Sequence, residues 1–372
     1  MKKMISLFLC CVALLGILAG CGTGDSPDQN TTATPETQAS VPADTAVPEA
    51  TEEAEVIPTQ SPEEEAVMKI LMIGQSHAQD AVWFLQTVLQ AEMPDREFLV
   101  VDVYQPLNIS QHIANIKADA EVYDYIEFRD GGFNKIENFR ISIALKKEQW
   151  DLIIFNEATW PQTHEHEHTD GDFAFLKNYI KENAAPGYKL AYNATWAQPI
   201  SKELYVGANR ADVPDGFRNK YEMWFGGDRT RHFAQICKLI ETYEETDPDF
   251  DFVFHSGTAI QYASETHGVP EADVERKYDL YRDYTHLSDF GRLIVAYQIY
   301  AQIFGLEELT EVNVDVIPAE MRATFREKPL GDIEITEEHK AAIIASVNYA
   351  LKNPNKAPTD TIRDTAVLEP LS

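Results

Sequence analysis

Five short apolar runs, separated by segments of helical character, constrain the fold of this chain more than any other feature. Runs of this length without polar alternation are typical of strands that are buried on both faces. Strands that alternate with helices form βαβ units, so the pattern predicts an α/β fold around a parallel sheet. The runs are Ile70–Ile73, Phe98–Tyr104, Leu152–Phe155, Leu190–Asn193 and Phe252–His255.

The N-terminal segment has the features of an export signal. Two lysines precede the apolar stretch Ile5–Ala19. The end of this stretch overlaps the sequence Leu18-Ala19-Gly20-Cys21. This resembles a bacterial lipoprotein signal, in which cleavage after the small residues leaves a cysteine that is acylated. An uncleaved membrane anchor is the alternative, but the apolar run is short for a bilayer span. We therefore expect residues 1–20 to be removed and Cys21 to carry lipid.

The next segment, residues 22–66, lacks the composition of a folded domain. It is rich in Thr, Pro, Ala and Glu and holds eleven acidic residues but no Lys or Arg. Such a segment cannot bury a core, so we interpret it as a disordered tether. The tether and the two signal lysines account for −9 of the formal charge of −30, which leaves −21 for residues 67–372. This charge argues against nucleic acid and anionic lipid as partners, so we expect membrane contact only through the N-terminal lipid.

The stretch "KILMIGQSHAQDAVWFLQTVL" places a serine between a strand and a helix. Gly74 ends the first apolar run, and helical spacing of apolar residues begins near Asp80. Ser76 therefore falls at the edge of the sheet where ligands of open α/β proteins bind. A Gly-x-Ser sequence is common by itself, and Ser76 could simply cap the helix.

A second informative stretch, "YRDYTHLSDFGRLIVAYQIYAQIFG", precedes a long apolar helix that we expect to begin near Leu287. Asp283 and His286 are three residues apart, so the carboxylate can accept one imidazole N–H. A nucleophile after the first strand and an Asp/His pair before the last helix make a Ser-His-Asp triad feasible. Taken singly, the pair could also be a local hydrogen bond at a helix start.

These two blocks resemble the first and last blocks of the SGNH (GDSL-type) hydrolases. More closely, "ILMIGQSHAQDA" is similar to the opening of an uncharacterised domain family allied to them and common in bacterial lipoproteins. The similarity continues through "NISQHIANI", "WDLIIFNEATW", "NATWAQ" and "SGTAIQYA" to "THLSDFGRLIVA", and so covers roughly residues 68–305. It implies a three-layer α/β/α, flavodoxin-like domain over residues 67–372, with parallel strand order 2-1-3-4-5 and a C-terminal extension over 306–372.

The resemblance also implies roles for individual residues. Ser76 would be the nucleophile, His286 the base and Asp283 the group that orients it. The Ser76 backbone N–H and the Asn156 side chain would donate to the oxyanion, the negatively charged oxygen of the intermediate. The glycine pair that supplies another donor in the family is replaced by Gln105 and Pro106, and proline has no N–H. That donor must come from Gln105, Leu107 or the Asn108 side chain, or be missing.

Further residues could contact a substrate at the same edge. His77 could compete for the serine proton, although its position favours an exposed helix-start residue. His255 closes the fifth run and could reach the site, or pack in the core. Trp160 and Trp196 follow the third and fourth runs, where two tryptophans would suit stacking on a sugar ring.

The histidine-rich stretch "THEHEHTD" is the chief candidate for a metal site. On a strand, His164, His166 and His168 would share one face and could hold a transition metal. Because the stretch contains Pro161 and precedes a helix expected near Asp170, we interpret it as a solvated loop, whose histidines and Glu165 could contact the substrate. We expect no metal and no cofactor.

Two other segments are placed by their pattern. Val122–Arg140, centred on "RDGGFN", is predicted to be an inserted hairpin. Ser201–Trp224 lacks periodicity and could be a lid. Cys237 would be the only cysteine of the folded part, and Cys21 would carry lipid, so no intramolecular disulfide is expected.

The functional prediction is a lipid-anchored serine ester hydrolase on the extracytoplasmic side of a bacterial membrane. It would act through an acyl-serine on a small-molecule or glycan ester, with a carbohydrate ester as the first substrate hypothesis. The alternative is a non-catalytic lipoprotein on the same fold that binds glycans or solutes, which the altered glycine pair favours.

Overall fold

The structure of the chain is a computed structural model. It describes residues 67–157, 161–198, 225, 228–267, 280–281, 285–315, 317, 321 and 335–359. The predicted signal peptide, Cys21, the tether and the segment 201–224 lie outside the described residues. In the part of the chain that is described, no helix combines the length and the apolar character that a membrane crossing requires.

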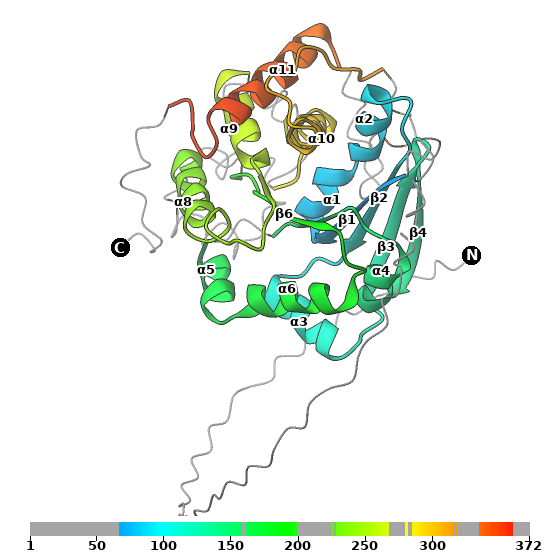
Figure 1. The fold of residues 1–372 in the computed structure, drawn as a ribbon. Coiled ribbons are helices and arrows are strands. Elements are labelled where there is room, and N and C mark those ends of the chain that lie inside the picture. Colours follow the sequence, from blue (N-terminus) through cyan, green and yellow to red (C-terminus); the bar gives the residue numbers. More distant parts are fainter. Residues whose placement is uncertain are drawn as a thin grey trace, which may run out of the picture. The chain divides into compact units, whose positions relative to one another are not determined.

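A mixed sheet of seven strands forms the centre of the described residues, in the order β4-β3-β2-β1-β5-β6-β7 (Figure 1). Neighbours from β2 to β7 in this order run parallel, whereas β3 is antiparallel to β2 and β4 to β3. The strands are β1 Met68–Gly74, β2 Phe98–Tyr104, β3 Tyr123–Arg129, β4 Gly132–Phe139, β5 Leu152–Phe155, β6 Lys189–Asn193 and β7 Phe252–Phe254.

This sheet corrects the expectation of a purely parallel one. The predicted hairpin is confirmed as β3 and β4, but it pairs with β2 and so extends the sheet by two antiparallel strands. The order 2-1-3-4-5 therefore describes only the five parallel strands, whose positions match the five apolar runs to within a residue or two.

Helices cover both faces of the sheet (Figure 1). The hydrophobic core on one face is formed with α1, α2, α9, α10 and α11, and the core on the other face with α3, α4, α6 and α8. The bounds are α1 Ser76–Val82, α2 Leu85–Glu92, α3 Ile109–Lys117, α4 Ile141–Lys147, α5 Pro161–Thr169, α6 Asp172–Asn183, α8 Arg229–Thr242, α9 Ser256–Thr266, α10 Asp289–Ile303 and α11 Glu337–Lys352.

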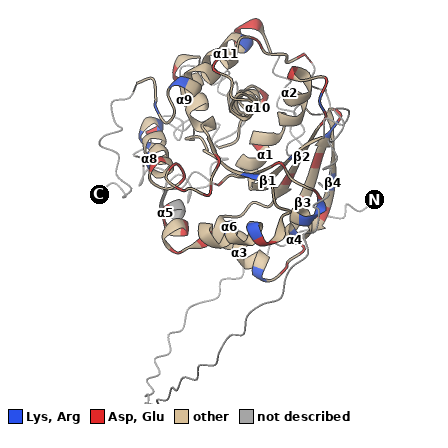
Figure 2. Cartoon of the chain, in the orientation of Figure 1, with Lys and Arg blue, Asp and Glu red and all other residues tan. Residues whose placement is uncertain are grey.

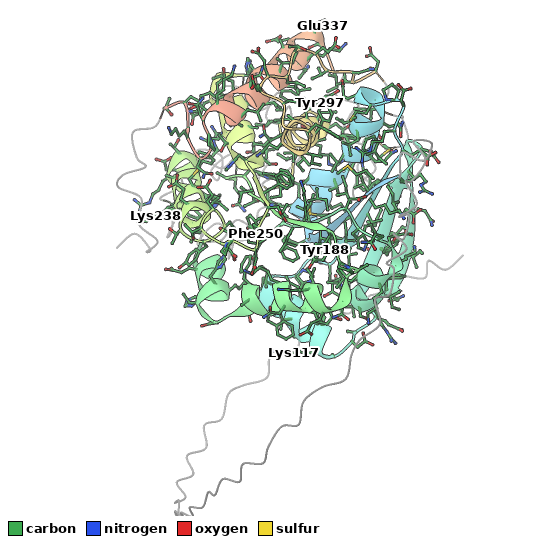
Figure 3. All side chains as sticks on the ribbon, viewed as in Figure 1. Lys117, Tyr188, Lys238, Phe250, Tyr297 and Glu337 are labelled. Carbon is green, nitrogen blue, oxygen red and sulfur yellow. The ribbon has the colours of Figure 1, made fainter. Side chains whose placement is uncertain are left out.

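The first strand shows why its sequence has no polar alternation. Ile70 and Met72 belong to the core under α10, whereas Leu71 and Ile73 belong to the core on the opposite face. A strand with a helical layer on each side buries every side chain. Side chains fill the space between the sheet and both layers (Figure 3).

Polar contacts also connect the elements of the α10 layer. Tyr297, labelled in Figure 3, lies on α10, and its hydroxyl donates a hydrogen bond of 2.8 Å to Oε1 of Glu92 on α2. The same hydroxyl accepts the backbone N–H of Asn313 at 2.7 Å. Acidic residues are spread over helices of both layers, consistent with the negative formal charge (Figure 2).

Candidate active site

The carboxyl ends of the parallel strands bring most of the predicted site residues to one edge of the sheet. Gly74 pairs with Tyr104 at the ends of β1 and β2, and Ile73 pairs with Phe155 at the ends of β1 and β5. Ser76, Gln105 and Asn156 follow these ends directly. Because the strands are parallel and in register, three segments that are far apart in sequence converge there.

Ser76 is the first residue of α1, as the strand-to-helix corner predicts. Gly74 makes the corner possible, because a Cβ there would lie 2.6 Å from the backbone O of Asn156 and 2.6 Å from Cβ of Ala78. The helix that follows is shorter than expected. It ends at Val82, and α2 begins at Leu85.

His286 is buried, with 6% of its surface exposed, just before α10. The helix begins at Asp289, two residues later than expected, and the Ser288 side chain caps it by accepting the backbone N–H of Gly291. The residues on either side of His286 both contact α1. Thr285 Oγ1 lies 2.9 Å from Nε2 of His77, and the N–H of Leu287 donates to Oδ2 of Asp80 at 2.9 Å. We call these contacts the two flanking hydrogen bonds.

His77 is not the exposed residue that the sequence favoured, since only 3% of its surface is exposed. Its Nδ1 lies 2.8 Å from Oγ1 of Thr195, and its ring stacks on Trp196 with 4.7 Å between centroids. The imidazole rings of His77 and His286 are in edge-to-face contact, with 6.0 Å between their centroids. Buried ring nitrogens require partners, and two threonine hydroxyls supply them.

Asp80 forms a buried ion pair that sequence reasoning missed. Its Oδ1 accepts Nε–H of Arg292 at 2.9 Å, and both residues are almost fully buried. The pair connects α1 to α10, on which Arg292 lies. A signal was present, because a charged residue within the apolar run of "GRLIVAYQIY" requires a partner.

Asn156 is placed beside the corner, but its amide group is already engaged. Nδ2 donates to the backbone O of Asn193 at 2.8 Å. The Asn193 side chain is in turn fixed by Ser256, whose hydroxyl donates to Oδ1 at 2.5 Å. The hydrogen bond to Asn193 thus holds the Asn156 carboxamide in one orientation, and Nδ2 of Asn156 carries one further proton.

The segment that replaces the glycine pair offers few donors. The backbone N–H of Gln105 donates to O of Gly74 at 3.1 Å, and that of Leu107 donates to O of Gln105 at 2.7 Å. The Gln105 side chain donates to the backbone O of Val122. Asn108 caps α3, because its Oδ1 accepts the N–H of Gln111 at 3.0 Å. Of the predicted alternatives, the Asn108 amide nitrogen is the group not used in this cap.

Four predicted site residues have other positions or are not described. Asp283 and Trp160 lie outside the described residues. Trp196 has no exposed surface and donates through Nε1 to the backbone O of Thr285 at 3.1 Å, so it cannot stack on a sugar. His255 contacts the C-terminal extension, where Nδ1 lies 3.2 Å from Oδ1 of Asn355. Burial lowers its pKa below the usual value, which is the behaviour of a packed histidine.

The histidine-rich stretch is a helix rather than a loop. It forms α5, and α6 begins at Asp172 after Gly171. On a helix, residues two apart point in different directions, so the three alternate histidines do not all share one face. His168 stacks between Phe173 and Tyr243, and its Nε2 lies 2.7 Å from Oε1 of Glu244. No group of three metal-binding side chains occurs among the described residues.

Two titratable groups near these elements are perturbed by burial. Burial raises the pKa of Asp102 on β2 well above its usual value, with a smaller opposing effect from the Gln79 side chain of α1. Burial also lowers the pKa of His112 on α3 to about 4, against a smaller opposing effect from Glu157. His112 is therefore neutral near pH 7, with Nδ1 3.1 Å from the Tyr123 hydroxyl.

These features define an α/β protein with a mixed central sheet and a cluster of buried polar side chains where the parallel strands end. Residues 69–316 match the family described as Domain of unknown function (DUF4886), and the chain belongs to that family. The expected resemblance to an uncharacterised domain family is thereby confirmed. A comparison with curated proteins gave no match.

Two solved structures are similar to the chain. A crystal structure of a DUF4886 family protein from Bacteroides uniformis is 23% identical, with a TM-score of 0.59, and the match covers 80% of this chain and 99% of that one. At this identity the likeness supports the fold alone. A proposed SGNH hydrolase from Slackia heliotrinireducens is 18% identical with a TM-score of 0.37, covering 64% of this chain and 100% of that one. This likeness is too small to support an argument, so the SGNH assignment stays a prediction.

Proposed function

We propose that the chain is a serine ester hydrolase in which Ser76 is the nucleophile and His286 the base. The observation that carries the proposal is the pair of flanking hydrogen bonds, because Thr285 and Leu287 both contact the helix that Ser76 begins. The two sequence blocks that resemble the hydrolase motifs thus belong to one buried cluster. Asp283, which lies outside the described residues, keeps its predicted role of orienting His286.

The proposed reaction has two steps. Oγ of Ser76 attacks the ester carbonyl carbon while Nε2 or Nδ1 of His286, whichever is unprotonated, takes the hydroxyl proton. The intermediate expels the alcohol, which takes that proton from His286, and an acyl-serine remains. Water then adds to the acyl-serine in the same way, which releases the acid and restores Ser76.

The negative charge that develops on the carbonyl oxygen requires donors. We assign the second Nδ2 proton of Asn156 and the amide nitrogen of Asn108 to this role, since the backbone N–H groups of Gln105 and Leu107 are used elsewhere. Each donor of this kind typically contributes about a hundred- to a thousandfold in rate.

A second candidate is a binding protein without catalysis, which is favoured because the backbone N–H groups of Gln105 and Leu107 are used elsewhere. If neither carboxamide reaches the oxyanion, the site loses most of its rate acceleration. The burial of Trp196 weakens the sugar-ester hypothesis, which counted on two exposed tryptophans at this edge. We therefore propose an ester of unspecified alcohol, with a carbohydrate ester as one member of the panel to be tested. The extracytoplasmic, lipid-anchored location belongs to the same proposal.

Labelling with a serine-directed phosphonate tests the proposal. The parent protein should be labelled at Ser76, and Ser76→Ala and His286→Ala should each lose nearly all labelling and nearly all hydrolysis of aryl acetates. The double variant should lose little more, because residues that act as a unit are not additive. Ser142→Ala is the matched control, because the Ser142 hydroxyl is bonded to Asp119 on the exposed side of α4 and should be irrelevant.

The outcomes separate the two candidates. A parent protein that is not labelled and hydrolyses no ester in a broad panel, yet binds a glycan or solute, would support the binding protein. Labelling that persists in Ser76→Ala would contradict the assignment of the nucleophile.

A further inference from the structure

The residues on either side of His286 connect its segment to other parts of the fold. Thr285 makes several of these contacts. Its backbone O accepts Nε1–H of Trp196 at 3.1 Å, and its Oγ1 accepts from Nε2 of Gln198 at 3.3 Å in addition to its contact with His77. All of these partners are buried. Thr285 thus joins the His286 segment both to α1 and to the loop after β6.

His77 occupies the middle of this arrangement. It follows Ser76 directly in the chain, and its two ring nitrogens reach Thr195 on one side and Thr285 on the other. Stacking on Trp196 fixes the plane of its ring. A change in the position of His77 would therefore move Thr285, and with it His286, relative to Ser76.

Asp80 restrains the other side of His286. It lies one helical turn after Ser76, accepts the N–H of Leu287 and is itself fixed by Arg292. Because His77 and Asp80 are three residues apart on one short helix, they lie on the same side of it. Hydrogen bonds thus connect the residues on both sides of His286 to α1, the helix that begins with Ser76.

We propose that His77 is a positioning residue, which sets the distance and orientation between His286 and Ser76 through Thr285 and does not bind substrate. The inference rests on the proposed function, in which His286 serves Ser76. Proton transfer depends steeply on geometry, and a displacement of about 1 Å can cost about a hundredfold in rate. A hydrogen bond next to the base is therefore a sensitive place for control of the rate.

Thr285→Val is the decisive variant, because it keeps the shape of the side chain and removes the hydroxyl that His77 contacts. We expect phosphonate labelling of Ser76 to slow by about tenfold or more. Thr285→Ser keeps the hydroxyl and should restore labelling to within about twofold of the parent. Thr87→Val is the matched control, since it removes another buried threonine hydroxyl, bonded to Sδ of Met321 on the α2 side.

A double-mutant cycle tests whether His77 acts through Thr285. His77→Phe keeps an aromatic ring on Trp196 and loses both hydrogen bonds. If one contact carries the effect, the double variant His77→Phe/Thr285→Val should be labelled no more slowly than the slower single variant. Losses that multiply in the double variant would overturn the proposal, as would labelling of Thr285→Val at the parent rate.

The state of His286 is the readout that a merely structural role would not change. The NMR signals of its ring, identified by their loss in His286→Ala, should change in Thr285→Val and stay the same in Thr285→Ser and Thr87→Val. If the parent protein is not labelled at all, the hydrolase proposal fails, and these signals alone decide the role of His77. Unchanged His286 signals in Thr285→Val would then overturn it.

Discussion

Asp102 is a carboxyl group without exposed surface in the strand next to β1. Its side chain lies on the same face of the sheet as Ile126, its partner in β3, below the layer of α1. Ionisation there would leave a charge away from water, and this desolvation raises the pKa well above the usual value. Asp102 therefore holds its proton at a pH at which an exposed aspartate is ionised.

The contribution of Asp102 to the free energy of unfolding should therefore decrease as the pH rises. In the unfolded chain Asp102 loses its proton near pH 3.8, whereas in the folded protein it loses it only at higher pH. Its contribution is thus fully present below pH 3.8 and is lost as the pH rises toward the folded-state pKa. Asp102→Asn has no proton to lose, so it should raise the melting temperature, and the gain should be larger at pH 8 than at pH 4.

Thermal melts at the two pH values check this prediction. Asp130→Asn is the control, because Asp130 is exposed in the turn of the hairpin and should change the melting temperature little at either pH. An Asp102→Asn variant that melts lower than the parent at pH 8 would show that the ionised carboxylate has a stabilising partner.

The sequence indicated where the site lies better than it indicated which of its side chains are buried. Ser76 and Asn156 follow strand ends that apolar runs mark, so their placement at the sheet edge could be predicted. The burial of His77 and Trp196 could not, because it depends on Thr195 and Thr285, which reach His77 from segments 118 and 208 residues further along the chain. No local pattern contains contacts at that separation.

At the scale of the element, α5 shows how a local pattern misleads. The alternation of histidine and glutamate has no helical periodicity, and proline together with many polar residues is typical of a loop. The segment is nevertheless a helix, with Glu167 buried, and the Ser110 N–H donating to its carboxylate at 3.2 Å. Tertiary contacts of this kind override weak intrinsic preferences.

We expect α5 to contribute to stability through His168 and without a metal. His168→Ala removes the imidazole that stacks on Phe173 and Tyr243 and leaves Glu244 without this partner. The loss of a buried hydrogen bond predicts a decrease of about 1–3 kcal/mol in the free energy of unfolding. His166→Ala, at an exposed position of the same helix, is the matched control and should be close to neutral.

Treatment with a chelator completes this test. A structural metal would contribute directly to the free energy of folding, so its removal would lower the melting temperature. We expect the parent protein to melt at the same temperature with and without chelator. A large decrease that added zinc reverses would contradict this view of α5.

At the scale of the whole molecule, the alternation of apolar runs and helices was sufficient to predict the five parallel strands. It could not predict that the hairpin would join the sheet, because an antiparallel pair beside β2 depends on register with Phe98–Tyr104 and not on its own pattern. The outer strand β4 is largely exposed, and Phe133 and Ile136 on it are among the large apolar side chains with exposed surface.

The N-terminal 66 residues bear on where such a domain would act. The sequence predicts that Cys21 carries lipid and that residues 22–66 hold the domain away from the membrane. Replacing the cysteine by serine should block acylation and release the protein from the membrane fraction.

Cell fractionation with a blot for the domain measures this prediction, and mass spectrometry of the N-terminus identifies the lipid. Cys237→Ser is the matched control, because this buried cysteine of α8 lies outside the signal and its loss should leave the protein in the membrane fraction. The membrane affinity of the parent should rest on acyl chains, since the acidic tether and domain are repelled by anionic lipid. Retention of Cys21→Ser with an intact residue 1–20 segment would show an uncleaved anchor in place of a lipid.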